Sequence, residues 1–251
     1  MCIALQPGII YGPIFSRRLG RSLGINILPV TKKVCSFDCV YCEYGRTTEH
    51  TLLPAGNDLP DLDEILTAVA HALKKPRTIE YLTFSGNGEP TLHPDFPDIV
   101  RGVRELLKRK RPESKLAIFS NASRLCAKEV AEAILIIDKP MLKLDAGSQE
   151  MFEGINRPVS DLHFDDILVG LQKIPHAIIQ SILIEGEISN LNEDAYEEWA
   201  GVLNRLRPHK IHIYSIERPT AESGVRYVSP EKLRQIQYDL KNRFNLDVDA
   251  F

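Results

Sequence analysis

Three cysteines lie close together in one short segment of the chain, at Cys35, Cys39 and Cys42. Their spacing is Cys-x3-Cys-x2-Cys, and the residue before the last cysteine, Tyr41, is aromatic. Three thiolates on one loop can hold three corners of a cubane iron–sulfur cluster, whereas most cysteine-rich runs that ligate such clusters supply all four thiolates. A cluster that lacks one protein ligand keeps an open iron, and open metal positions are where substrates bind and react. The segment therefore predicts a reactive iron–sulfur site.

Zinc is the alternative metal for these cysteines. Structural zinc sites usually draw on two pairs of Cys or His ligands that lie far apart in the sequence. The two remaining cysteines, Cys2 and Cys126, are isolated and form no second pair. On the zinc interpretation the chain is a zinc-stabilised binding module rather than an enzyme, and the purified protein is colourless. A lone cysteine such as Cys126 is expected to be an ordinary packed side chain.

The composition is that of a folded domain of ordinary charge. The chain has 251 residues, of which 43% are hydrophobic, and a formal net charge of -3. This balance argues against a disordered chain and against a generally basic nucleic-acid binder. No apolar run is long enough to span a membrane, and the first residues do not resemble a secretory signal. Five cysteines, three of them clustered, do not form a disulfide framework, so we expect a cytoplasmic protein without membrane contact.

Strand-like and helix-like stretches alternate along the chain. Short β-branched or apolar runs predict strands at residues 23–28, 79–84, 115–119, 141–144, 177–184 and 210–214. Amphipathic runs predict helices at residues 62–73, 96–109, 127–134, 164–173, 194–206 and 230–244. Such alternation implies parallel strands with crossover helices. The prediction is therefore an α/β fold, a partial (β/α)6 TIM-type barrel, in one domain over residues 1–251, with residues 1–23 as a basic segment before the barrel.

A second motif follows the second predicted strand. Residues 85–90 read Ser-Gly-Asn-Gly-Glu-Pro. Glycines permit positive φ and close approach of the backbone to a ligand, and exposed backbone groups can pair with a zwitterionic amino acid as an edge strand does. Glu89 is placed to orient an ammonium group. The alternative is an ordinary turn. Because the loops at the carboxyl ends of barrel strands build the active site, this motif and the cysteine segment are expected to meet in one pocket.

Basic residues form a third feature. Three arginines, Arg17, Arg18 and Arg21, precede the cysteine segment, and Arg157 follows the fourth predicted strand. Guanidinium groups suit phosphate and carboxylate, so these residues are candidates for binding a phosphorylated or acidic substrate. The alternative is a solvated basic loop.

The cysteine spacing with its aromatic residue, together with Gly88-Glu89-Pro90 after the next strand, resembles the radical S-adenosylmethionine (SAM) superfamily. The resemblance implies a [4Fe-4S] cluster on Cys35, Cys39 and Cys42, and SAM as the second cofactor. It further implies that the cluster, once reduced, cleaves SAM to a 5′-deoxyadenosyl radical that abstracts hydrogen from a substrate. By the same resemblance, the expected SAM contacts are Tyr41, Ser85, Gly86, Asn87, Gly88, Glu89, Ser120, Asn121 and Asp145.

Within that superfamily the chain is similar to the proteins related to wyosine tRNA-base synthetases. The similarity rests on residues 16–24, the cysteine segment, residues 45–47 and residues 88–91. The chain lacks the second cysteine trio of the true synthetases. The substrate is left open between a small molecule, an RNA base and a protein glycine, and a glycyl-radical-enzyme activase is the alternative activity. An electron donor such as flavodoxin or ferredoxin is the expected partner.

Overall fold

The computed structural model describes residues 2–75 and 78–251. The centre of the molecule is a curved sheet of eight strands. Its strand order is β1-β2-β5-β6-β7-β8-β10-β12, and every neighbouring pair is parallel except β1 with β2. The strands are β1 Ile10–Ser16, β2 Gly20–Ile25, β5 Tyr81–Phe84, β6 Lys115–Ser120, β7 Lys139–Lys143, β8 Ile178–Ile182, β10 Lys210–Tyr214 and β12 Val248–Ala250. Within these residues β1 and β12 do not pair, so the barrel stays open.

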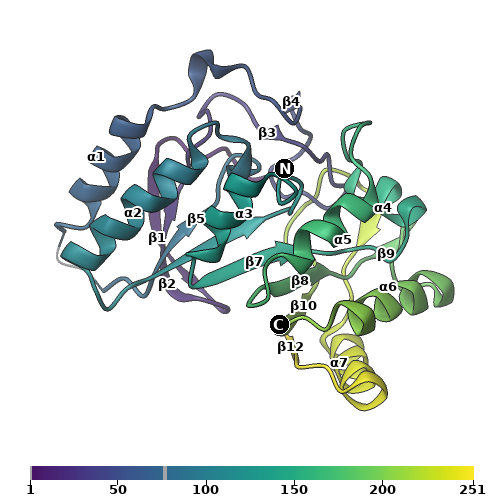
Figure 1. Ribbon diagram of the computed structural model, residues 1–251. Helices are drawn as coiled ribbons and strands as arrows, with labels where there is room; N and C mark the ends of the chain where they lie inside the picture. Colours follow the sequence, from purple (N-terminus) through teal and green to yellow (C-terminus); the bar gives the residue numbers. More distant parts are fainter. Residues whose placement is uncertain (1, 76–77) are drawn as a thin grey trace.

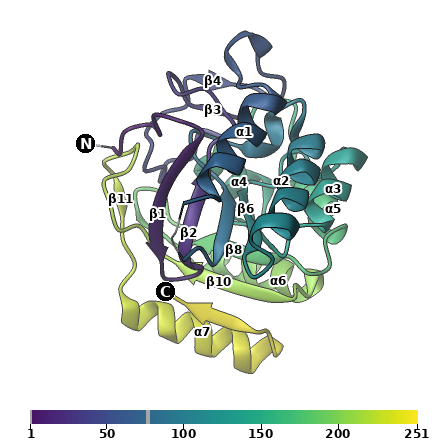
Figure 2. The ribbon, with the colours of Figure 1, turned by 90° about the vertical axis from the view of Figure 1, so that its left-hand side faces the viewer.

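Helices cover the outer face of this sheet, as Figures 1 and 2 show. They are α1 Leu62–Ala72, α2 Phe96–Lys110, α3 Lys128–Leu135, α4 Gln149–Asn156, α5 Phe164–Gln172, α6 Glu193–Leu206 and α7 Pro230–Phe244. Two short ladders lie among the loops, β3 Val34–Cys35 with β4 Glu49–His50 and β9 Glu185–Gly186 with β11 Val225–Arg226. The remaining elements are the single turns η1 Gly56–Asp58 and η2 Pro90–Leu92.

Side chains alternate along each strand between two faces of the sheet. One face packs against the helices and forms the hydrophobic core, and the other lines the inside of the barrel, here called the inner wall. Leu82 and Phe84 of β5 are fully buried in the core beneath the helices, whereas Thr83 between them faces a cavity inside the barrel. The same alternation in β10 places Ile213 in the core and Tyr214 at the cavity. The inner wall is therefore polar and aromatic, which is the composition of a binding site rather than of a packed core.

The predicted architecture is confirmed: all six predicted strands form, in one parallel series, and all six predicted helices form. The expectation that residues 1–23 precede the barrel is corrected, because β1 and the start of β2 lie inside this segment and pair as an antiparallel hairpin at the sheet edge. Two further elements, α4 and β12, were not predicted from the sequence because they are short. Ser229 caps α7 by accepting from the backbone of Lys232, as the Ser-Pro start of that helix suggests.

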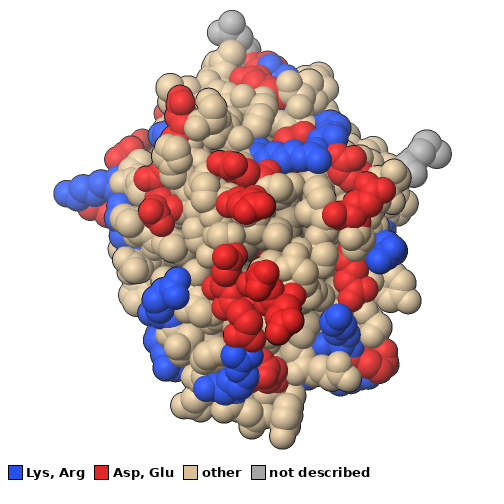
Figure 3. All heavy atoms as spheres, turned by 90° about the vertical axis from the view of Figure 1, so that its right-hand side faces the viewer, with Lys and Arg blue, Asp and Glu red and all other residues tan. Residues whose placement is uncertain are grey.

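The surface carries both signs of charge. On the face shown in Figure 3, Asp and Glu side chains gather near the middle, and Lys and Arg lie scattered toward its lower and upper parts. This face therefore does not offer the continuous basic stripe that binds a nucleic-acid backbone. Of the helices in the described chain, none is long and apolar enough to cross a membrane.

Candidate active site

The cysteine loop, residues 35–42, begins where β3 is attached to the glycine loop, residues 85–90. The backbone N–H of Val34 donates to the carbonyl of Asn87 at 2.9 Å, and the N–H of Glu89 donates to the carbonyl of Val34 at 3.0 Å. This close approach requires glycine at position 88, where φ is +136° and an added Cβ would lie 1.7 Å from the Val34 carbonyl oxygen. The two motifs identified in the sequence are thus joined directly through their backbones.

Each cysteine sulfur in this loop receives its own nitrogen donor. The Lys33 Nζ lies 3.1 Å from the Cys42 Sγ, the Asn121 Nδ2 lies 3.6 Å from the Cys35 Sγ, and the Asn156 Nδ2 lies 3.5 Å from the Cys39 Sγ. The three donors come from three different parts of the sequence, and all three donor residues are buried. Such donors stabilise thiolates, and hydrogen bonds to the sulfurs are one of the means by which proteins tune cluster potentials.

Burial favours the neutral thiol form of Cys35 and Cys39 in the protein without metal. It raises the pKa of Cys39 to about 11, with the neighbouring Cys42 adding to the effect, and it raises the pKa of Cys35 further. For Lys33 burial acts against the charge, but the nearby sulfurs of Cys42 and Cys35 outweigh it and the pKa is raised. A bound cationic metal reverses the preference of the thiols, because coordination deprotonates them.

The donor set fits an iron–sulfur cluster better than a single ion. Zinc holds four ligands about 2.0–2.3 Å from one centre, which forces them close to one another. In residues 2–75 and 78–251 no three His, Cys, Asp or Glu side chains are grouped closely enough to hold a single ion. The three sulfurs are of intermediate burial and each has its own nitrogen donor, an arrangement that suits a group larger than one ion.

Glu89 lies behind the glycine loop. Its Oε1 accepts from the Thr91 N–H at 3.1 Å, the Thr91 hydroxyl at 2.6 Å and the Ser120 hydroxyl at 2.8 Å, and its Oε2 accepts from the Asn121 N–H at 2.6 Å. The residue is 2% exposed, and burial raises the pKa of the carboxyl despite these four donors. Its carboxylate fastens the glycine loop to the end of β6, and its role in orienting an ammonium group stays a prediction.

The expected ribose contacts also lie in the supporting structure. Ser120 and Asn121 bind Glu89, and the Asn121 side chain also donates to the Ser36 hydroxyl at 2.9 Å. The carboxylate of Asp145, 2% exposed, accepts from the Tyr41 hydroxyl and from the Asn156 amide, and forms a 3.1 Å ion pair with Lys143. All three residues are buried, and none is among the described residues that line the cavity in front of the cysteine loop. They brace that loop, and their contact with a ribose stays a prediction.

Asn87, the residue that interrupts the glycine pair, connects the loop to the N-terminal segment. Its Oδ1 accepts from the Gln6 N–H at 2.7 Å, and its Nδ2 donates to the carbonyls of Gln6 at 3.0 Å and Pro29 at 2.9 Å. Asn87 is fully buried and its side chain is used in these three hydrogen bonds. It places Ile3 and Gln6 at the wall of the cavity.

A cavity of about 460 Å³ opens in front of the two loops. Of the predicted SAM contacts it brings together Tyr41, Ser85, Gly86 and Gly88, and one of the cysteines, Cys42, also lines it. The cavity continues along the inner wall of the sheet, where its lining includes Lys143, Gln180 and Tyr214. Its volume is within the range of about 300–1,000 Å³ that is usual for small-molecule sites.

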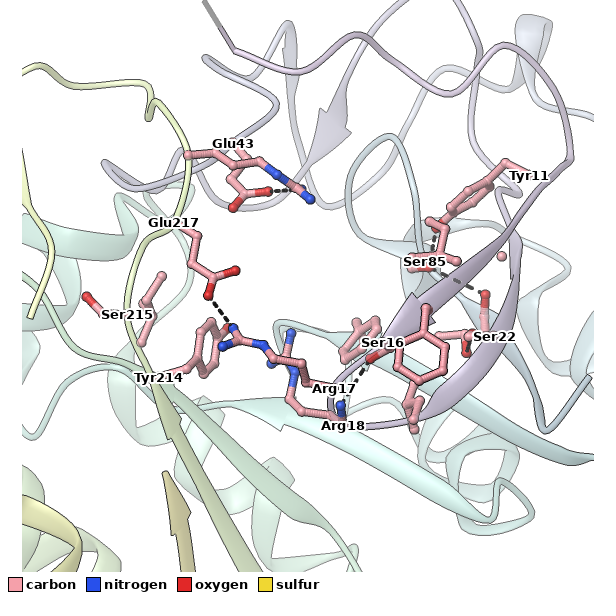
Figure 4. Close-up of a pocket in the computed structure, with 18 residues that line it drawn as sticks. Tyr11, Ser16, Arg17, Arg18, Ser22, Glu43, Ser85, Tyr214, Ser215 and Glu217 are labelled. Carbon is pink, nitrogen blue, oxygen red and sulfur yellow. Dashed lines mark hydrogen bonds and ion pairs between the residues drawn. The ribbon is translucent and has the colours of Figure 1, made fainter. Parts of the chain in front are cut away.

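A second cavity of about 280 Å³ adjoins the first under the β1–β2 hairpin, and Figure 4 shows the side chains around it. The two cavities share several residues, among them Tyr11, Arg18, Ser85 and Tyr214. Two of the four predicted substrate residues, Arg17 and Arg18, line the second cavity. An open groove of about 1030 Å³ continues outward from Glu217 and Arg218.

The other two predicted substrate residues lie elsewhere. Arg21 is exposed and alternates along β2 with Ser22, which faces the cavity, so Arg21 is on the opposite side of the strand. The Arg157 Nη1 donates to the Glu222 Oε1 at 2.6 Å, and Glu222 also binds Arg46. Neither arginine is among the described residues that line the two cavities, and their role toward a substrate stays a prediction. Arg157 helps to hold the cysteine loop, because the Glu222 N–H donates to the Val40 carbonyl at 3.1 Å.

Sequence reasoning missed the buried partners of the loop. Lys33 and Asn156 carry no motif of their own, and Lys143 and Tyr214 lie inside strands. The sequence does hold a signal for Lys143 and Tyr214, which end the strands β7 and β10. A charged or hydroxyl-bearing side chain on a buried strand needs a hydrogen-bond partner. The Lys143 Nζ donates to the Tyr214 hydroxyl at 3.0 Å and pairs with Asp145.

Comparison with known proteins gives a family. The model of the radical SAM superfamily matches residues 30–203. A UPF0026 protein of Methanocaldococcus jannaschii is 33% identical over 234 residues, which cover 91% of this chain and 68% of that protein. A protein of Brachyspira hyodysenteriae described as GTPase Obg is 27% identical over 96% of this chain, but this chain spans only 35% of that protein, so its name does not transfer.

Solved structures share the fold at low sequence identity. Streptococcus suis SuiB bound to S-adenosylmethionine matches with a TM-score of 0.64 and 13% identity, over 91% of this chain and 50% of SuiB. TYW1 with a lysine-pyruvate adduct matches with a TM-score of 0.61 and 13% identity, over 88% of this chain and 73% of TYW1. At this identity the likeness concerns the architecture, and the ligands of those proteins are theirs.

Proposed function

Because this chain belongs to the radical SAM superfamily and, within it, to the UPF0026 proteins, we propose that it cleaves SAM reductively and uses the resulting radical on a substrate held inside the barrel. The superfamily consists of enzymes that use SAM and an iron–sulfur cluster. The observation that carries the proposal is the arrangement of the cysteine loop, in which three sulfurs each have a buried nitrogen donor and Cys42 opens onto the cavity.

In the proposal, Cys35, Cys39 and Cys42 hold a [4Fe-4S] cluster. The group, when bound and reduced, supplies the electron that cleaves SAM. Lys33, Asn121 and Asn156 donate hydrogen bonds to the three sulfurs. Hydrogen bonds and a buried positive charge beside the sulfurs raise a reduction potential, so these residues adjust how easily the centre accepts its electron.

SAM is proposed to lie in the 460 Å³ cavity. Gly86 and Gly88, both with φ of +136°, present backbone to the methionine part, and the ring of Tyr41 forms a wall beside the cysteine loop. The Glu89 carboxylate keeps the loop in this shape from behind. Since the loop and its supports are already hydrogen-bonded to each other, little reorganisation is needed when SAM binds.

The adjoining 280 Å³ cavity is proposed to hold the part of the substrate that loses hydrogen. It lies along the inner wall between the hairpin and β10, beside the proposed SAM position. Walls such as Phe119, Ile182 and Leu19 are apolar and exclude water from a reactive intermediate.

A wyosine-type reaction is not the form of the proposal that we favour. A nucleophilic lysine must lose its proton, whereas Lys143 is paired with Asp145, and although burial opposes its charge that carboxylate raises the pKa of the amine. Cys2 and Cys126 lie apart, with their sulfurs near the carbonyls of Thr220 and Asp166 respectively. We therefore propose a single-cluster enzyme, served in the cytoplasm by a small electron donor such as flavodoxin or ferredoxin.

The test is spectroscopic and needs no substrate. The protein is reconstituted anaerobically with iron and sulfide, reduced with dithionite, and examined by electron paramagnetic resonance with and without SAM. The proposal predicts a brown protein whose reduced signal changes on addition of SAM, because SAM would bind next to the cluster that Cys35, Cys39 and Cys42 would hold. A colourless protein that carries zinc, or a cluster whose signal ignores SAM, would contradict it.

A further inference from the structure

The cations around the two cavities differ in whether they have a carboxylate partner. Arg17 pairs with Glu217 at 2.5 Å, Arg218 pairs with Glu43 at 2.8 Å, and Lys143 pairs with Asp145 at 3.1 Å. Figure 4 shows the pair of Arg17 and Glu217 at the cavity. Arg18 lines both cavities and forms no ion pair with any residue in 2–75 or 78–251.

The Arg18 guanidinium is held in place without having its hydrogen bonds satisfied. Its carbon lies 4.4 Å from the centre of the Tyr214 ring and 5.3 Å from the centre of the Phe119 ring. Its Nη1 is buried and has no hydrogen-bond partner among the described residues. Aromatic faces stabilise a cation, but they do not accept its N–H bonds, so the buried Nη1 of this half-buried guanidinium remains short of an acceptor.

A second free donor lies beside it. The Tyr214 hydroxyl accepts from the Lys143 Nζ at 3.0 Å, which leaves the hydroxyl hydrogen available to donate. Lys143 is itself charged and lies 5.1 Å from the centre of the same ring. Arg18 and Tyr214 therefore both present donors along the wall that the two cavities share.

We infer that Arg18, together with the Tyr214 hydroxyl, binds an anionic group of the substrate, a carboxylate or a phosphate. An acceptor with negative charge satisfies the guanidinium N–H and the hydroxyl at once, and a charge-assisted hydrogen bond of this kind is strong. A neutral substrate would leave the charge of the half-buried Arg18 without a carboxylate or phosphate partner. The inference rests on the proposed function, since it identifies the class of substrate that the radical attacks. Arg17, whose charge Glu217 already balances, has no such role.

Arg17 and Arg18 are neighbours on one turn, so they form a matched pair of variants. Binding is measured on the anaerobically reconstituted, SAM-loaded protein without reductant, by calorimetric titration with inorganic phosphate and separately with malonate at constant ionic strength. Because no turnover is involved, the result does not depend on whether SAM is cleaved. A failure of the proposed function would appear in the wild-type protein as a missing response to SAM.

The expected result is that the wild-type protein and Arg17→Gln bind at least one of the two anions, and that Arg18→Gln binds it about 10- to 100-fold more weakly. The anion that binds more tightly identifies the substrate group as phosphate or carboxylate. Arg18→Lys keeps the charge but not the planar fork, and is expected to fall between the two.

Equal anion affinity in Arg17→Gln and Arg18→Gln would overturn the inference. So would the absence of binding of either anion to the wild-type protein. A comparable loss of SAM affinity in Arg18→Gln would also overturn it, because Arg18 would then serve the carboxylate of SAM and not the substrate.

Discussion

The two ends of the inner cavity are built differently. At the cofactor end, the cysteine loop and the glycine loop are fastened by buried hydrogen bonds, and Glu89 alone accepts four. At the substrate end, under the β1–β2 hairpin, the contacts are exposed ion pairs such as Arg17 with Glu217, whose side chains are 56% and 58% exposed. Exposed pairs contribute little to stability, whereas a buried acceptor cannot lose its donors without a large penalty.

The contrast between buried hydrogen bonds at one end and exposed ion pairs at the other suggests that the substrate end of the fold can change while the cofactor end stays the same. The cofactor end must hold its groups in one geometry, so its polar residues bind one another and leave few free donors. The substrate end keeps Arg18 unsatisfied, which is unfavourable for the empty protein but useful for recognising a ligand. The two ends should therefore respond very differently to substitution, and the following variants test that contrast.

The largest effect is expected at the cysteine loop. Cys39→Ala removes one of three protein ligands, so the iron and sulfide content after reconstitution should fall to background and SAM cleavage should be lost. Chemical analysis for iron and sulfide measures this directly. Cys126→Ala is the matched control, because Cys126 is exposed and lies away from the loop. Normal cluster content in Cys39→Ala would contradict the assignment of the ligands.

Glu89→Ala should give the next largest effect, and it should lower both the free energy of unfolding and the cluster content. Four donors lose their acceptor in a buried site, so the free energy of unfolding should fall by on the order of 3 kcal/mol. Cluster content should fall as well, because Asn121 connects Glu89 to Cys35. Denaturant unfolding and iron analysis measure the two changes. A variant of unchanged stability and cluster content that merely binds SAM weakly would support the ammonium-binding role that the sequence suggested.

His212 offers a test on the inner wall away from both loops. Its ring is nearly buried, its Nδ1 has no partner among the described residues, and burial lowers its pKa from 6.5 to about 4. The charged groups that face it are Asp249, Arg18, Lys210 and Lys139. Because the unfolded chain takes up the proton first, the neutral ring contributes stability above pH 6.5 that is lost as the pH falls toward 4.

The loss is roughly 3 kcal/mol at most, as expected for a shift of this size in a nearly buried ring. Unfolding free energies measured between pH 7 and pH 5 should therefore decline more steeply for the wild-type protein than for His212→Gln. Equal slopes would show that His212 is not held neutral.

The smallest effect is expected at the exposed ion pair of the substrate end. Arg17→Gln should change the free energy of unfolding by less than about 1 kcal/mol, because both partners are solvated. Thermal unfolding at low and at high salt gives the value, and salt should reduce even this difference. A loss comparable to that of Glu89→Ala would remove the contrast between the two ends.

The sequence predicted the fold because the fold depends on local pattern. Helices such as α2 repeat apolar residues at three- and four-residue spacing, and the strands between them are short and apolar. The hairpin strand β1 was not predicted, because it contains Gly12 and Pro13 and such a pair usually marks a turn. The three cysteines proposed as cluster ligands stand out in the sequence because ligands on one loop are close in sequence.

The roles of the other site residues depended on contacts across the chain. Glu89 and Ser120 are 31 positions apart, and Tyr41 and Asp145 are 104 apart, so nothing in the local sequence shows that they bind each other. Each was expected to contact SAM because its type suited a ligand, but the same type suits a buried partner equally well. Arg21 is different: the alternation of a strand already places it opposite Ser22, once β2 is known to begin at Gly20.

The central claim is that the cysteine loop supports reductive cleavage of SAM. The most direct measurement is an anaerobic reaction of the reconstituted protein with SAM and dithionite, in which 5′-deoxyadenosine is quantified by mass spectrometry, with Cys39→Ala alongside. The account predicts 5′-deoxyadenosine from the wild-type protein and none above background from the variant. A wild-type protein with a complete cluster that forms none, even with extracts that contain phosphorylated and carboxylate metabolites, would contradict it.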